Sequence, residues 1–425
     1  MDTVRCADRI RSCFSLLVVV AITACGGGSG DTAQTDASAS ALAGTTVSNW
    51  IDFAAEGDTS VSYTGVVRYG YALSWVTKTV GAEGVFDCNT YFLGIPGVSG
   101  TAAIDPAPGF TKSCQKQVFA ANVVQTGGMP VVNVPLIQPA YKGYSTARVQ
   151  SGGDTGNPNQ DTGAFREPCT PSHFAFDDPI VFPDQPGKSH LHLFFGNTGA
   201  SATTTAANIA TTGDSTCAGG TLNRTGYWVP AVIDMRTGAP LVPTEQLFYY
   251  KGGYLGVPMA SIVSFPAGLR MIAGSSANTA DSTDTSVIRI WCEGGDGTPR
   301  RYIPSCNKGE QLSFTVIFPQ CWDGLNLDSP DHKSHMAYAN NGCPSTHPVA
   351  LPEVSLVMRY TVVDSGTNTY LKLSSDNYTG VGGYSMHADW FNGWDTSILN
   401  EWVTNCINPS KDCHEVLLGD GRYLY

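Results

Sequence analysis

Charged side chains are scarce in this chain. They make up 14% of its 425 residues, and 36 acidic residues outnumber 24 basic ones, which gives a formal net charge of −12. Proteins that bind nucleic acid present a basic surface to the phosphates, so this acidic balance argues against a nucleic-acid partner. Apolar runs are short as well, and none reaches the roughly 18 apolar residues that a membrane-spanning helix needs. We therefore expect no transmembrane segment.

Several catalytic and ligand-binding motifs are also missing. The sequence contains neither of the glycine-rich loops that cradle nucleotide phosphates, Gly-x-Gly-x-x-Gly and Gly-x-x-x-x-Gly-Lys-Ser/Thr. It has no Gly-x-Ser-x-Gly turn, which argues against a serine nucleophile of the α/β-hydrolase type. There are 13 cysteines but no Cys-x-x-Cys spacing, so a zinc ribbon is not expected.

The first 24 residues have the features of a targeting signal. Arg5, Arg9 and Arg11 form a positive segment, an apolar run follows, and Cys25 precedes a glycine-rich stretch. This pattern resembles the lipobox of bacterial lipoproteins, in which the cysteine becomes the lipid-modified N-terminus; an ordinary secretory peptide is the alternative. We expect lipidation at Cys25. Because Gly26 follows it, we expect an outer-membrane lipoprotein facing the periplasm or the cell surface.

The remaining cysteines favour an oxidising compartment. Once Cys6, Cys13 and Cys25 are set aside, an even number is left, as expected of an exported protein with disulfides. Their spacing does not determine the connectivity. Pairing of near neighbours gives Cys88–Cys114, Cys169–Cys217, Cys292–Cys306, Cys321–Cys343 and Cys406–Cys413.

Turn-forming residues are abundant, with 47 Gly and 25 Pro, and they separate short runs of strand-forming residues. The pattern predicts a mainly β protein whose main domain is an antiparallel, sandwich-like structure rich in loops and disulfides. Strands of this domain are expected at residues 179–182, 190–195, 227–233, 247–250, 286–291, 312–318, 354–363 and 370–373. One helix is expected at residues 396–406, where Asp395 or Thr396 can cap a segment with apolar residues at helical spacing.

Changes in composition predict the domain organisation. A signal peptide (1–24) is followed by a flexible tether rich in Gly, Ser and Thr (25–45). A small β module (46–115), a connector with one strand at 130–137 (116–165) and the main domain (166–425) complete the chain.

Polar side chains concentrate in three parts of the main domain, the densest at residues 318–348 and the others before and after it. We expect the three parts to converge on one site. The candidate catalytic residues are Asp178, His190, His192, Asp331, His335, His387 and Asp389.

The spacing of the histidines suggests how they are presented. His190 and His192 are two apart in a strand-like run, so both imidazoles should project from one face. His387 and Asp389 repeat this spacing, and His335 lies in the polar stretch between the two pairs. Imidazoles that converge in this way bind divalent metals, and His190, His192 and His335 are the candidate ligands.

Three interpretations fit these residues. In the first, histidines and one carboxylate hold a divalent ion that activates water for hydrolysis. In the second, Asp178, Asp331 or Asp389 act as paired carboxylates on a polysaccharide without a metal. In the third, the polar residues satisfy one another beneath disulfide-tied loops. The aromatic residues expected to line a sugar cleft are Trp322, Trp390 and Trp394.

Two parts of the chain resemble known families. The main domain resembles DUF1996, a family of unknown function found in secreted proteins of fungi and bacteria. The matching blocks are residues 176–183, 189–197, 215–217, 227–230, 265–270, 318–324, 332–338, 343–348 and 387–389. This resemblance implies secretion and a shared fold, and it carries no catalytic assignment.

The small β module is similar to one appended to many secreted bacterial proteins, carbohydrate-active enzymes among them. The similarity rests on residues 55–57, 67–70, 78–79, 88–89, 105–109 and 112–114. This copy lacks the cysteines usual around residues 56–57 and has an insertion at 93–103.

These observations predict an exported lipoprotein that acts on extracellular or cell-envelope polysaccharide, as a hydrolase with a His/Asp-centred site. The alternative is a non-catalytic carbohydrate-binding or surface-adhesion protein. One divalent ion is the candidate cofactor, and the sequence predicts no oligomeric state.

Overall fold

The computed structural model describes residues 129–425 without a gap, together with Cys88 and the strand segments 49–55, 61–62, 65–71, 74–80, 85–86 and 113–118. The chain divides into two units, Met1–Ala43 and Gly44–Tyr425, and every described residue belongs to the second. The expected signal peptide and the lipidated Cys25 lie outside the described residues.

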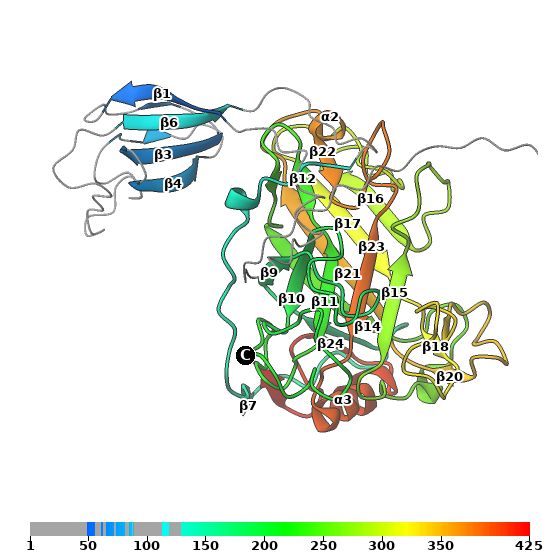
Figure 1. Ribbon diagram of the computed structural model, residues 1–425. Helices are drawn as coiled ribbons and strands as arrows, with labels where there is room; N and C mark the ends of the chain where they lie inside the picture. The colour runs from blue at the N-terminus through cyan, green and yellow to red at the C-terminus, as the bar shows by residue number, and fades with distance from the viewer. Residues whose placement is uncertain are drawn as a thin grey trace, which may run out of the picture. The chain divides into compact units, whose positions relative to one another are not determined.

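A five-stranded antiparallel sheet forms one half of the main domain (Figure 1). Its strands follow the order β15-β23-β11-β10-β9. The bounds are β9 (Pro171–Ala175), β10 (His192–Gly196), β11 (Gly226–Pro230), β15 (Arg270–Gly274) and β23 (His387–Phe391). Strands far apart in the sequence are therefore neighbours, and the C-terminal β23 lies between β15 and β11.

A six-stranded sheet forms the other half, in the order β16-β17-β21-β14-β8-β24. Its bounds are β8 (Ala164–Glu167), β14 (Glu245–Lys251), β16 (Ile288–Glu293), β17 (Gln311–Ile317), β21 (Glu353–Thr361) and β24 (Asp412–Glu415). The pairs are antiparallel except that β24 runs parallel to β8.

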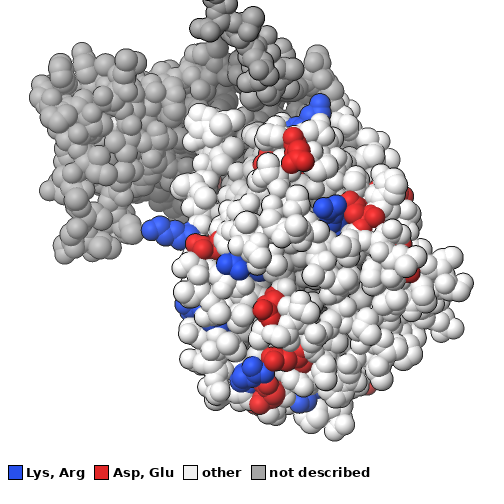
Figure 2. All heavy atoms as spheres, turned by 60° about the horizontal axis from the view of Figure 1, so that its bottom comes forward, with Lys and Arg blue, Asp and Glu red and all other residues white. Residues whose placement is uncertain are grey.

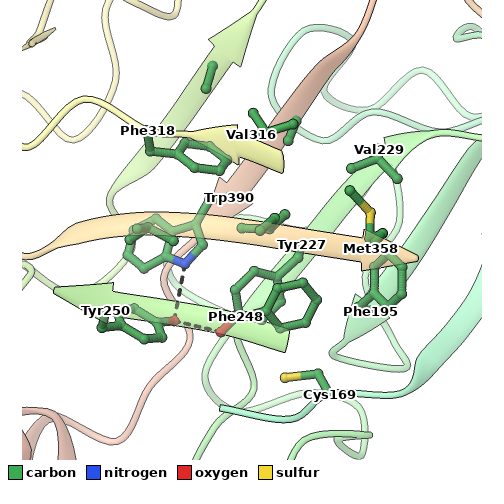
Figure 3. Close-up of a cluster of buried hydrophobic side chains, with 14 of the residues drawn as sticks. Cys169, Phe195, Tyr227, Val229, Phe248, Tyr250, Val316, Phe318, Met358 and Trp390 are labelled. Atoms are coloured by element: carbon green, nitrogen blue, oxygen red, sulfur yellow. Dashed lines mark hydrogen bonds between the residues drawn. The ribbon is translucent and has the colours of Figure 1, made fainter. Parts of the chain in front are cut away.

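The two sheets share one hydrophobic core. Leu193, Tyr227 and Trp390 of the five-stranded sheet and Phe248 and Leu356 of the six-stranded sheet are fully buried in the same cluster. Figure 3 shows Tyr227, Phe248 and Trp390 in this core, with the Tyr250 hydroxyl hydrogen-bonded to Tyr227 and accepting from Trp390 Nε1. Because alternate strand residues point inward, the others face away from this core. The expected mainly β, antiparallel architecture is confirmed.

Short elements complete the main domain. Small sheets are formed by β12 (Val232–Asp234), β13 (Ala239–Pro240) and β22 (Leu371–Leu373), by β18 (Cys321–Trp322), β19 (Met336–Ala337) and β20 (Val349–Ala350), and by β7 (Val149–Ser151) with β25 (Arg422–Leu424). The helical segments are η1 (Val134–Leu136), η2 (Met259–Ser261), α2 (Thr367–Tyr370), α3 (Thr396–Trp402) and η3 (Val403–Ile407). No helix of the described residues has the length and apolarity needed to cross a membrane.

The predicted helix near residue 396 is confirmed. α3 begins after Asp395, whose side chain accepts hydrogen bonds from the backbone N–H groups of Ser397 and Ile398. This cap satisfies two of the donors that a helix start leaves unpaired. The last predicted turn continues as the π-helix η3.

The expected small β module contains a separate four-stranded sheet in the order β1-β6-β3-β4. Its strands are β1 (Asn49–Ala55), β3 (Gly65–Tyr71), β4 (Ser74–Val80) and β6 (Ser113–Val118), and β2 (Val61–Ser62) pairs with β5 (Val85–Phe86). Val67 and Tyr69 are fully buried in it.

Five disulfides join described cysteines, and they are the near-neighbour pairs. These are Cys88–Cys114, Cys169–Cys217, Cys292–Cys306, Cys321–Cys343 and Cys406–Cys413. Several disulfides in one chain are typical of an extracellular or otherwise oxidising compartment.

Two strand predictions were wrong. Residues 179–182 form a turn, because the Asp178 carboxylate accepts hydrogen bonds from the N–H groups of Ile180 and Val181. Residues 130–137 contain the short helix η1, with a proline in its first turn. In both segments a local turn-forming residue outweighs the strand propensity of Val and Ile.

Charged groups are dispersed over the surface in view in Figure 2. Lys, Arg, Asp and Glu side chains occur there in small mixed groups separated by uncharged atoms. The described residues in this view therefore form no extended patch of one sign.

Candidate functional site

Two histidines and one aspartate project from the face of the five-stranded sheet that lies away from the shared core. His192 pairs with Pro230 across β10 and β11, and Trp228 pairs with Asp389 across β11 and β23. Continuing the second register by two residues puts Pro230 opposite His387. Side chains of directly opposed residues point to the same face, so His192 and His387 flank Pro230 there.

His190 precedes β10 by two residues and joins this group. Its ring centroid lies 4.2 Å from that of His192 and 5.1 Å from that of His387. The rings of His192 and His387 are 5.7 Å apart. One potential ligand nitrogen from each of the three imidazoles lies within 4.8 Å of the others.

Two carboxylates border the imidazoles. Ligand atoms of Asp178, His192 and Asp389 also lie within 4.8 Å of one another, and Asp389 Oδ2 is 3.9 Å from His387 Nε2. We refer to His190, His192, His387, Asp178 and Asp389 as the His/Asp cluster. The structure thus brings together the polar residues expected before and after the 318–348 stretch.

Loops bury the cluster although it lies outside the shared core. The exposed fraction is 0% for His192, 4% for His387, 3% for Asp178 and 1% for Asp389, while His190 is partly exposed. Apolar residues of the loops and of β10, β11 and β23 pack beside it, on the same sheet face. This second cluster consists of Ile180, Phe194, Ala200, Ile209, Trp228 and Phe391.

Backbone carbonyls fix the orientation of two imidazoles. His192 Nδ1 lies 2.9 Å from the carbonyl oxygen of Asp177, and His387 Nδ1 lies 2.8 Å from that of Ser385. A carbonyl only accepts, so each Nδ1 carries the proton and donates it. In the neutral ring Nε2 then keeps its lone pair, which is the tautomer that a metal ligand requires.

The residues behind these carbonyls are themselves held by hydrogen bonds. The Asp177 carboxylate accepts from the N–H groups of Gly187 and Ala202. Ser385 Oγ donates to Asp376 at 2.6 Å, and Asp376 also accepts from backbone N–H groups. The sequence does not predict Asp376 and Ser385 as supports; their nearness to His387 along the chain is the one signal it offers.

Burial shifts every titration in the cluster toward the neutral form. It lowers the pKa of His192 and of His387 to about 4, and it lowers the pKa of His190 well below its usual value. It raises the pKa of Asp178, and it raises the pKa of Asp389 well above its usual value. Desolvation penalises charge on each of these groups.

Several polar atoms of the cluster have no hydrogen-bond partner in the protein. They are His190 Nε2, His192 Nε2, Asp389 Oδ1 and Asp389 Oδ2. Buried polar atoms in folded proteins are nearly always paired, so atoms left unpaired together indicate an additional ligand. A divalent cation fits, because neutral imidazole nitrogens and a carboxylate are its common ligands and its charge would compensate the buried carboxylate.

The 318–348 stretch lies against this site but contributes other residues than expected. Lys333 Nζ donates to the carbonyl of Gly274, which pairs with His387 across β15 and β23. The positive charge of Lys333 helps to lower the pKa of His387 and opposes the rise at Asp389. His332 is the imidazole of this stretch that interacts electrostatically with Asp178.

His335 and Asp331 do not join the His/Asp cluster. Both nitrogens of His335 are occupied, by Ser329 Oγ at 2.9 Å and by the carbonyl of Arg270 at 2.7 Å. Asp331 is exposed, and it accepts hydrogen bonds from Ser329, Lys333 and Ser334 within its own turn. These bonds lower the pKa of Asp331. Both residues therefore shape the loop instead of supplying ligands.

The aromatic residues expected in a sugar cleft are packed instead. Trp390 is fully buried and Trp394 is 2% exposed, and both indoles donate to the Tyr250 hydroxyl. Trp322 is partly exposed and donates to the carbonyl of Asn326. The sugar-stacking role expected of Trp390 and Trp394 is therefore wrong.

The described residues thus define a disulfide-bonded β-sandwich protein with a buried His/Asp cluster on one outer sheet face. Residues 178–394, about half of the chain, match the family described as domain of unknown function (DUF1996). The chain belongs to this family. The matched range begins at Asp178 and includes every member of the cluster. No curated protein and no solved structure was found to match the chain.

Proposed function

We propose that this protein is an exported lipoprotein that hydrolyses extracellular or cell-envelope polysaccharide with a metal-dependent His/Asp site. The observation that carries the proposal is the convergence of three neutral imidazoles whose nitrogens lie within 4.8 Å of one another. His190, His192 and His387 would hold one divalent ion, and Asp389 would provide the compensating charge beside it. Three protein ligands are the usual number in catalytic zinc sites, which keep a position for water.

Asp178 is the candidate for the group that transfers protons in the reaction. A divalent ion at this site would polarise a water molecule and make it a stronger nucleophile at neutral pH. Asp178 Oδ1 is engaged by two backbone N–H groups, which holds the carboxyl in place and leaves Oδ2 to exchange a proton. Because burial raises its pKa, Asp178 is suited to accept a proton from water and return it to the leaving oxygen.

A cell-envelope location rests on the sequence. The signal-like N-terminus and Cys25 support export and lipid anchoring at the outer membrane, and the disulfides are consistent with an oxidising compartment. The similarity of the N-terminal module to modules of carbohydrate-active proteins supports a polysaccharide as substrate.

A non-catalytic carbohydrate-binding protein is the second candidate, and the burial of the cluster favours it. An ion held by largely buried side chains would serve structure, and sugar would then bind at a surface aromatic group. Tyr302, Tyr378 and Tyr384 form such a group: their rings are partly exposed, with centroids 5.1 Å apart for Tyr378 and Tyr384 and 6.2 Å for Tyr302 and Tyr384.

Elemental analysis of the purified mature protein tests the metal first. We expect about one divalent ion per chain, lost in the His190→Ala/His192→Ala variant. It should be retained in His347→Ala, whose histidine is bonded to Thr346 and Ser334 away from the cluster. A folded wild-type protein that takes up no divalent ion would refute the metal site.

Polysaccharide assays then separate the two candidates. Release of reducing ends that stops with chelator and returns with the ion supports the hydrolase. Retention on an insoluble polysaccharide without hydrolysis, unchanged by chelator, supports the binding protein.

A further inference from the structure

A second polar site lies on the six-stranded sheet, on the face that points away from the shared core. A hollow of about 300 Å³ opens there, lined mainly by β8, β14 and β24 together with residues 160–162 and Tyr254. Ala164 lies between Lys251 and Asp412 in the strand register, and its small side chain leaves the hollow's floor open. The His/Asp cluster belongs to the other sheet, so the two sites are separate.

Lys251 is the cation of this hollow that no described carboxylate pairs with. Its side chain is partly buried, and among the described residues no hydrogen bond or ion pair to its ammonium group is found. The second cation, Arg166, is already neutralised, because it forms two hydrogen bonds with the Asp412 carboxylate, at 2.8 and 3.1 Å. A partly desolvated ammonium group without a hydrogen bond or an ion pair favours an anionic ligand.

The charged groups near Lys251 do not remove its preference for an anionic ligand. Glu353 lies opposite Lys251 on β21 and attracts it without forming an ion pair, while Arg289 adds positive charge nearby. Glu353 is buried, and burial raises its pKa, so its own negative charge is disfavoured. Asp161 is exposed to solvent at the rim of the hollow.

The remaining lining suits a sugar. The Lys251 ammonium lies 4.9 Å from the centre of the Tyr249 ring and 5.3 Å from that of Tyr254, so two aromatic side chains flank the cation. Gln160 and Thr162 add amide and hydroxyl groups that can bond to ligand hydroxyls. The volume is at the small end of the range for ligand pockets, which corresponds to a single ring.

We propose that this hollow binds one acidic sugar unit of a polysaccharide, with the ligand carboxylate on Lys251 and the ring against the Tyr249 and Tyr254 side chains. This site goes beyond the proposed hydrolase centre and does not depend on it. It would tether the protein to an anionic glycan through the sheet opposite the His/Asp cluster.

Calorimetric titration with tri-galacturonate, compared with its methyl ester, tests the charge preference. We expect the wild-type protein to bind the acid at least tenfold more tightly than the ester. Lys251→Met should weaken binding of the acid about tenfold or more, and Lys142→Met, at an exposed lysine outside the hollow, should not. Equal affinity for acid and ester, or no binding of either at millimolar concentration, would overturn the proposal.

Chemical protection gives a readout that needs no variant. Tri-galacturonate should slow acetylation of Lys251, followed by mass spectrometry of the wild-type protein, and should leave Lys142 unaffected. Unprotected Lys251 in the presence of bound ligand would refute the assignment. Binding that persists in His190→Ala/His192→Ala locates the sugar away from the His/Asp cluster, whereas its loss there would assign the ligand to that cluster.

Discussion

Replacing Asp389 with asparagine tests the His/Asp cluster most directly. The side chain is 1% exposed, neither carboxylate oxygen has a hydrogen-bond partner, and burial raises its pKa well above the usual value. Asparagine has nearly the same shape but cannot ionise. Without metal, Asp389→Asn should therefore be as stable as the wild type or more stable, since no buried carboxylate needs compensation.

The variant should lose most of the stabilisation that a metal confers. At an ion concentration 100 times the dissociation constant, binding stabilises the folded wild type by about 2.7 kcal/mol. If loss of the compensating charge weakens binding about a hundredfold, the same ion concentration stabilises the variant by only about 0.4 kcal/mol. The gap of roughly 2 kcal/mol is well within the reach of denaturant titration.

Unfolding in urea with chelator and with Zn²⁺ or Mn²⁺ measures both quantities. Asp331→Asn is the matched control, because this exposed carboxylate orders its own turn and lies outside the cluster. It should keep the full metal response. Equal metal stabilisation of Asp389→Asn and the wild type would refute the assignment of Asp389.

The pH dependence of the free energy of unfolding tests the raised pKa of Asp389 independently of metal binding. A carboxyl group whose pKa is raised in the folded protein binds more protons there than in the unfolded chain, so its contribution falls as pH rises above about 3.9. In chelator, the wild type should therefore lose stability relative to Asp389→Asn as the pH rises from this value. The two proteins should converge in acid, and parallel pH profiles would show that Asp389 is not perturbed.

Three further predictions follow from neighbouring groups. Lys333→Met should strengthen metal binding severalfold in calorimetry, because it removes a positive charge near His387 that would repel a bound cation. Weaker binding would contradict this. His335→Ala should lower the free energy of unfolding by about 2 kcal/mol, through loss of two buried hydrogen bonds, while metal content stays at the wild-type value. Removing the Cys321–Cys343 disulfide, which spans 22 residues, should cost about 3 kcal/mol in urea unfolding, and a cost near zero would show that the loop is held by other contacts.

Local sequence patterns were sufficient to predict much of the fold. Alternation and turn residues indicated β10, β14 and β17, and a capping aspartate with helical spacing indicated α3. The disulfides join successive cysteines along the chain, at sequence separations from 7 to 48. The order of strands in the sheets was not predictable, because β23 enters the five-stranded sheet from almost 160 residues beyond β11, and no local signal encodes that pairing.

The cluster was predictable where its members are two residues apart. His190 and His192, and His387 and Asp389, could be assigned to common faces from strand geometry alone. His335 had a similar sequence context but a different role, because its nitrogens meet Ser329 and the Arg270 carbonyl only in the folded loop. Sequence spacing predicts the face to which a side chain points. It does not predict which groups occupy the ring nitrogens, such as the Arg270 carbonyl, 65 residues from His335.

The loop that covers the cluster is held by hydrogen bonds that the periodic pattern of the sequence does not predict, and Asp177 makes two of them. Its carboxylate holds the N–H groups of Gly187 and Ala202 while its carbonyl orients His192. The covering loop is thus fixed by polar side-chain-to-backbone bonds as well as by apolar contacts. Asp177→Ala should weaken metal binding about tenfold, the usual effect of losing a residue that orients a ligand, although Asp177 offers no atom to the ion. Asp177→Asn keeps one acceptor oxygen and should retain more affinity in the same calorimetric assay. Equal losses in the two variants would show that the carboxylate does not position His192.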